Sequence, residues 1–140
     1  MIKANDKMKQ FLFLSACALM ILLFAAALAS AQDQPIIDVS VQITSGRTPP
    51  GWIVNKPDEI AQLKEFLKGL PSATPVEEPS FGAFLLTSNE AISGFPRSVL
   101  IFKGVIRVSK LDRIEQFFQD VKGLRTFLVK KAVEHGINIQ

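Results

Sequence analysis

The stretch Ser98-Val-Leu-Ile-Phe-Lys-Gly-Val-Ile-Arg-Val-Ser109 carries the strongest local signal of fold in the chain. Two runs rich in β-branched and apolar residues flank Lys103-Gly104, a pattern typical of two strands joined by a tight turn. Glycine adopts the positive φ of such a turn easily, whereas lysine fits it less well than asparagine or aspartate. The predicted register pairs Phe102 with Val105, Ile101 with Ile106, Leu100 with Arg107 and Val99 with Val108.

The residues before this hairpin predict two more strands and a helix. From Ile36 to Thr44 apolar and polar residues alternate, as in a strand with one buried face, and Phe81 to Thr87 is an apolar run short enough for a buried strand. Between them, Pro57 suits the first position of a helix that ends near Gly69. The segment Ser45–Asn55 is rich in proline and glycine, so we expect a loop there.

A long final helix is expected after the hairpin. Ser109 and Asp112 have the spacing of an N-terminal capping pair, and apolar residues recur at helical spacing as far as Ala132. Gly123 lies inside this pattern, where glycine costs about 1 kcal/mol relative to alanine. It therefore marks the point at which the helix would divide, and Gly136 closes the pattern.

These elements follow the order β-α-β-β-β-α, which predicts an α+β fold. We expect a two-layer sandwich in which a mixed sheet of about four strands carries both helices on one face. The first strand, the first helix and the second strand would form a right-handed crossover. If residues 137–140 pair as an edge strand, the fold becomes a ferredoxin-like variant instead.

The N-terminal segment is typical of an export signal. Lys3, Lys7 and Lys9 precede an uncharged apolar stretch from Phe11 to Ala29, and small residues suit cleavage after Ala31. We therefore expect a signal peptide at 1–31 and a single exported α/β domain at 32–140, periplasmic or secreted. An uncleaved membrane anchor is one alternative, because the apolar stretch approaches bilayer length. A second is lipidation at a lipobox-like Leu14-Ser-Ala-Cys17, which few apolar residues precede.

Charge and cysteine content exclude several classes of function. Without the leader's three lysines and one aspartate, the chain carries thirteen basic and twelve acidic residues, a balance of +1. Bases and acids are interspersed, so we expect no nucleic-acid partner. The single cysteine lies in the leader, which removes disulfides, thiol catalysis and cysteine metal sites from the mature chain. Membrane contact is expected only through the leader, if it stays uncleaved.

An apolar patch on the sheet is the first candidate binding surface. The hairpin register places Leu100, Phe102 and Val105 on the face away from the helices. Contiguous apolar patches often mark interfaces, either with another exported protein or with a second copy. The alternative is that the proline-rich connection Pro71–Ser80 or the N-terminus covers the patch.

The loop Ser45-Gly-Arg-Thr-Pro-Pro-Gly-Trp52 is the second candidate site. It resembles the Ser-Gly-Arg-x-x-Pro-x-Trp motif of a family of small uncharacterised exported proteins, with Thr48 where that motif favours proline. The resemblance implies a fold and an exported location, and no activity. Arg47 and Trp52 are candidate binding residues, through stacking or pairing with a carboxylate. The alternative is that Trp52 fills the end of the core while Arg47 bonds loop carbonyls.

The sequence contains little that suggests catalysis. His135 is the only histidine and lies near a helix end, where a capping role is expected. Glu77 and Glu78 are adjacent and would point apart if extended. We expect no catalytic residue, cofactor or metal site. The function predicted is that of an exported, non-enzymatic protein-binding or accessory module. The alternative is a small-ligand carrier or enzyme with a pocket between sheet and helices.

Overall fold

The computed structural model describes residues 9–10, 12, 14–15, 34–42, 48–78, 82–89, 92–110 and 114–139. The chain divides into two compact units, Met1–Asp33 and Gln34–Gln140. The expected signal peptide at 1–31 falls almost entirely outside the described residues. Within the described ranges, no helix is both long and apolar enough to cross a bilayer. Two hydrophobic clusters of described residues lie in the second unit.

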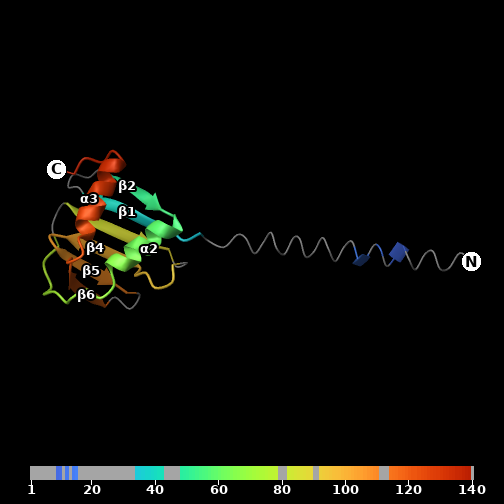
Figure 1. Ribbon diagram of the computed structural model, residues 1–140, viewed down its shortest axis with the longest axis horizontal. Helices are drawn as coiled ribbons and strands as arrows, with labels where there is room; N and C mark the ends of the chain where they lie inside the picture. The colour runs from blue at the N-terminus through green and yellow to red at the C-terminus, as the bar shows by residue number, and fades with distance from the viewer. Residues whose placement is uncertain are drawn as a thin grey trace, which may run out of the picture. The chain divides into compact units, whose positions relative to one another are not determined.

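The second unit is built on a six-stranded antiparallel sheet in the order β2-β1-β3-β4-β5-β6 (Figure 1). The predicted fold class, a mixed sheet of about four strands in the order β-α-β-β-β-α, is therefore wrong. The elements are β1 (Ile37–Gln42), β2 (Gly51–Val54), α2 (Pro57–Phe66), β3 (Ala83–Ser88), β4 (Ser98–Phe102), β5 (Val105–Ser109), β6 (Glu115–Gln119) and α3 (Leu124–Glu134).

The central hairpin has the predicted register. Val99 pairs with Val108, Phe102 pairs with Val105, and the residues between them pair in step. Lys103 and Gly104 have φ values of 42° and 76°, so both turn residues adopt the positive φ of a primed hairpin turn. Lysine accepts this conformation here because the two strands fix the turn on both sides.

Two of the strands lie where the sequence predicts a loop and a helix. β2 lies within the expected loop Ser45–Asn55, and it pairs antiparallel with β1. β6 lies within the expected final helix, and it pairs antiparallel with β5. Because β1 contacts β2 and β3 antiparallel on either side, the predicted right-handed crossover is absent from the described sheet. The ferredoxin-like variant is not formed either, since residues 137–139 are not in a strand.

The last helix begins only after Gly123, which has a left-handed φ of 75°. The carboxylate of Asp120 accepts hydrogen bonds from the N–H groups of Leu124 (2.7 Å) and Arg125 (2.8 Å). These bonds satisfy donors that the first turn of a helix leaves without partners. Gly123 and Asp120 together therefore set the start of α3, and they free the preceding residues to form β6.

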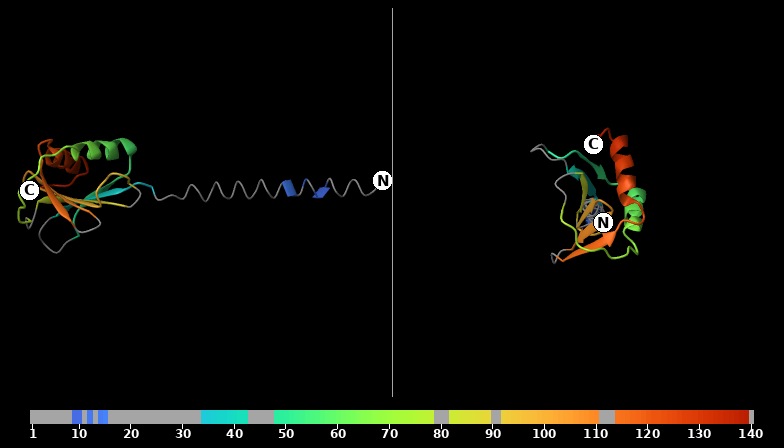
Figure 2. Two further views of the ribbon diagram at one scale, coloured as in Figure 1. Left: turned by 90° about the horizontal axis from the view of Figure 1, so that it is seen from below. Right: turned by 90° about the vertical axis from the view of Figure 1, so that its left-hand side faces the viewer.

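Both helices lie on the same face of the sheet (Figure 2). The main core is the layer between them and the sheet, and it includes Phe84, Leu63 and Leu128, which are almost fully buried. At one sheet edge, the chain after α2 runs beside β6. There the Gln119 N–H donates to the Pro71 carbonyl (2.9 Å), and the Ala73 N–H donates to the Phe117 carbonyl (2.9 Å). At the other edge lies β2.

Candidate functional site

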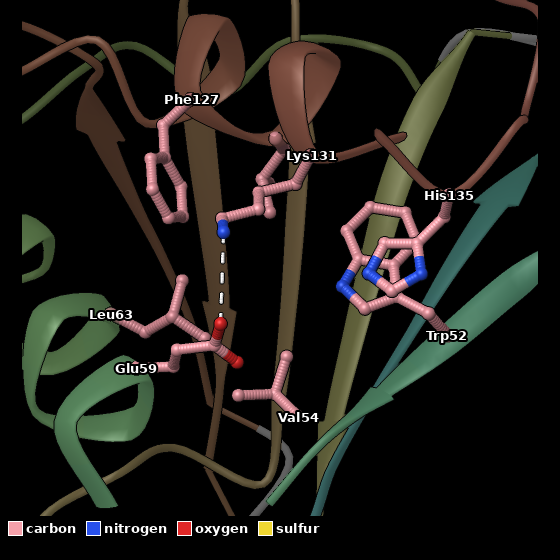
Figure 3. A pocket seen from close by; sticks show the side chains of 8 residues that line it. Trp52, Val54, Glu59, Leu63, Phe127, Lys131 and His135 are labelled. Atoms are coloured by element: carbon pink, nitrogen blue, oxygen red, sulfur yellow. Dashed lines mark ion pairs between the residues drawn. The ribbon is translucent and has the colours of Figure 1, made fainter. Parts of the chain in front are cut away.

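A hollow between β2, α2 and α3 is a candidate site among the described residues (Figure 3). It holds about 290 Å³ of space, open solvent included. Because this volume includes open solvent, the enclosed part of the hollow is far smaller than the about 300–1,000 Å³ of pockets for drug-sized ligands. Its lining residues come from three elements that are far apart in the sequence: Trp52, Val54, Glu59, Leu63, Phe127, Leu128, Lys131 and His135.

Simple periodicities place these side chains together. In β2, Trp52 and Val54 are two residues apart and so share the helix-facing side of the strand. Glu59 and Leu63 are four residues apart and share one face of α2. The same spacing relates Phe127 and Lys131 in α3 to His135, which directly follows the helix.

Trp52 forms one wall of the hollow and contacts two other aromatic rings. Its indole stacks on the imidazole of His135, with ring centroids 5.1 Å apart and an interplanar angle of 15°. It also meets the Phe84 ring edge to face at 6.5 Å. Only 9% of the residue is exposed. The expectation that Trp52 closes the end of the core agrees with this packing, and the exposed margin of the ring faces the hollow.

An ion pair joins α2 to α3 across the hollow. The Lys131 ammonium lies 3.6 Å from a Glu59 carboxylate oxygen and 3.2 Å from one of Glu134. Figure 3 marks the pair with Glu59. The ammonium also lies 5.9 Å from the centre of the Phe127 ring. The hydrogen bond that Lys131 donates to the Glu134 carboxylate, followed by the charges of Glu134 and Glu59, raises the pKa of Lys131 above its ordinary value. Lys131 is therefore charged at neutral pH, and the ion pair gives the hollow a polar margin.

The side chains around the hollow combine apolar walls, one ion pair and one imidazole ring. His135 ends α3 with its backbone N–H, which donates to the carbonyls of Lys131 (3.0 Å) and Ala132 (3.1 Å), and its ring stacks on Trp52. Among the described residues no group of histidine, cysteine and carboxylate side chains could hold a metal ion. The apolar walls can take an apolar group, and the ion pair can hydrogen-bond a neighbouring polar one.

The structure describes one of the two candidate residues that the sequence places in the loop Ser45–Trp52. Trp52 lines the hollow, as described above. Arg47 lies outside the described residues, so its stacking on Trp52 or its pairing with a carboxylate stays a prediction. The partner ring that Trp52 does have, His135, was missed because it comes from the other end of the sequence. The spacing of Phe127, Lys131 and His135 was the available signal that they share a face of one helix.

The candidate residues on the second sheet face are largely buried. Leu100 is 2% exposed and Phe102 is 1% exposed, and with Ala83 they form a separate small cluster against which Leu85 and the half-buried Val105 pack. Burial this complete leaves no surface on Leu100 or Phe102 for a partner. The described end of the proline-rich connection reaches this face, because Glu78 pairs with Arg107 of β5 at 3.1 Å.

Comparisons of the chain with protein-family models, curated proteins and solved structures gave no significant match. The resemblance of the Ser45–Trp52 motif to a family of exported proteins therefore stays a prediction.

Proposed function

We propose that residues 34–140 form a non-enzymatic binding module whose site is the hollow beside Trp52, and that it recognises an apolar side chain of a partner protein. The observation that carries this proposal is the joint lining of one hollow by Trp52, Phe127 and Leu63, with a charged pair at its margin. Well-packed pockets that contain an aromatic anchor are where binding energy concentrates in interfaces.

The size of the hollow favours a side chain over a whole metabolite. About 290 Å³ that includes open solvent leaves little enclosed room for a free drug-sized molecule. A leucine or phenylalanine side chain needs less space, and the rest of its chain can remain outside. Export by the leader at 1–31 is part of the same proposal, and it makes another exported protein the expected partner.

The proposal predicts that N-acetyl-leucinamide and N-acetyl-phenylalaninamide perturb the emission of Trp52. Trp52 is the only tryptophan and the chain has no tyrosine, so its fluorescence reports on the site alone. Replacing Phe127 with alanine should weaken binding about tenfold, because one apolar wall is lost.

Phe66→Ala is the matched control for this titration. The centre of the Phe66 ring lies 5.1 Å from that of Phe127, but Phe66 does not line the hollow, so Phe66→Ala keeps every lining side chain and binding should stay within about twofold of wild type. A saturable titration with wild type and Phe66→Ala that is weakened by Phe127→Ala supports the proposal. Equal affinities of all three proteins, or no response of Trp52 to either amide, would refute it.

A further inference from the structure

The outer edge of β2 has backbone groups that point away from the sheet. The Val41 N–H donates to the Pro50 carbonyl (2.8 Å), which makes Val41 and Pro50 a hydrogen-bonded pair of the β1–β2 ladder. Because such pairs alternate in an antiparallel ladder, Trp52 and Val54 also turn their backbone groups toward β1. The N–H and C=O groups of Gly51 and Ile53 therefore face outward.

These outward groups have no hydrogen-bond partner among the described residues. The opposite edge differs, because the Pro71–Ala73 segment bonds to β6 and covers it. The Ile53 side chain is 61% exposed beside the open groups. Natural sheets usually cover or blunt their edges, so an open edge next to a binding hollow suggests a site for strand addition.

We propose that β2 accepts an extended, basic segment of a partner protein as a seventh strand, and that an apolar side chain of this segment enters the hollow beside Trp52. This inference rests on the proposed function and adds the backbone recognition to it. A residue of the added strand that lies opposite Trp52 projects to the same face, with Cβ atoms about 4.5–5.5 Å apart. Its side chain therefore lies at the β2 wall of the hollow.

Charge favours a basic partner. Near the open edge, Asp38 lies opposite Ile53 on β1, and Asp58 follows β2 at the start of α2. Among the described residues of β2, its β1 neighbour and the hollow's margin, carboxylates outnumber cations: Asp38, Asp58, Glu59 and Glu134 against Lys56 and Lys131. Lysine or arginine residues in the added strand would complement this surface.

The extent of the edge argues against a second copy of the chain as the occupant. Two β2 strands centred on Trp52 would form a symmetric set of backbone hydrogen bonds, but β2 has only four residues. A stable dimer buries about 800 Å² on each partner. Two paired strands of four residues bury much less area than that. A peptide whose side chain also enters the hollow buries this side chain in addition.

The test uses the full chain in mild detergent and the peptide acetyl-Lys-Val-Thr-Leu-Thr-Val-Lys-amide, whose central leucine would lie opposite Trp52. The two threonines would pair with Gly51 and Ile53, so their N–H groups would point toward β2. N-methylation of both threonines should weaken binding about tenfold, since two backbone hydrogen bonds are lost. N-methylation of the leucine is the matched control, because its N–H points away and affinity should stay within about twofold.

Two further peptides test the side chain and the charge. Alanine in place of leucine should weaken binding by about tenfold or more, and glutamate in place of both lysines should weaken it further at low salt. If the threonine and leucine N-methyl peptides bind equally, strand addition is wrong while the hollow still binds. If N-acetyl-leucinamide binds and the peptide does not, the same conclusion follows.

Two other outcomes would also overturn the inference. If neither the amide nor the peptide binds, the proposed function fails together with it. If sedimentation finds a dimer that Ile53→Lys dissociates, the occupant of the edge is a second copy of the chain.

Discussion

Replacing Phe102 with alanine is expected to lower the free energy of unfolding by about 3–5 kcal/mol. Phe102 is 1% exposed and packs with Leu100 and Ala83 on the face away from the helices. Truncating so buried a ring removes apolar contacts and leaves a cavity that neighbouring strands cannot close. The loss is a large fraction of the roughly 5–15 kcal/mol by which native domains are stable. Urea unfolding followed by the emission of Trp52 measures it.

Val105→Ala is the control for this prediction. Val105 lies directly opposite Phe102 in the hairpin but is only partly buried, so its truncation should cost markedly less. An equal unfolding midpoint for Phe102→Ala and wild type would mean that the second face is not a packed core. In that case Leu100 and Phe102 would be candidates for an exposed binding patch.

Gly51→Ala is expected to destabilise the domain by about 1–3 kcal/mol. A Cβ atom at Gly51 would lie 2.3 Å from the backbone carbonyl oxygen of Val39, so the two strands must separate for alanine to fit. The contact is with backbone, which cannot rotate away as a side chain would. Because Trp52 follows directly, the movement should also disturb its stacking on His135 and weaken binding in the hollow. Thermal melting and the amide titration measure the two effects.

Ile53→Ala is the control for Gly51→Ala on the same strand. Its side chain is largely exposed, so its truncation should change stability by no more than about 0.5 kcal/mol. If Gly51→Ala has the same melting temperature as wild type, then β2 does not approach β1 as closely as the Gly51–Val39 contact requires.

The hairpin was predictable because its information is local. Two strand-forming runs and a glycine-containing turn specify Val99 to Val108 without help from the rest of the chain, and the structure confirms that register. The start of α2 at Pro57 was likewise predictable from adjacent residues. Where neighbouring residues decide the outcome, pattern alone suffices.

The two missed strands depend on contacts that are distant in sequence. β2 has only Trp52 and Val54 to indicate alternation, and it is a strand because β1 pairs with it. In β6 the adjacent Phe117 and Phe118 suit a helix stripe as well as a strand. Pairing with β5 on one side and with Ser72 on the other selects the strand. Periodicity over five residues could not decide between these alternatives.

The candidate site was only partly predictable for the same reason. Trp52 stood out in an unusual loop, but its neighbours in the hollow come from α2 and α3, and only the folded chain brings them together. The hairpin register predicted an apolar surface on the sheet face away from the helices. Its burial was one of two alternatives left open, because the path of the proline-rich connection follows from pairs such as Glu78–Arg107.

Amide hydrogen exchange resolved by NMR tests the central claim, an open β2 edge beside the Trp52 hollow. In the free chain, the amides of Trp52 and Val54 should be protected by β1, whereas those of Gly51 and Ile53 should exchange freely. Saturation with the leucine peptide should slow exchange at Gly51 and Ile53 by about tenfold or more. Protection of these two amides in the free chain, or unchanged exchange in the saturated complex, would contradict the account.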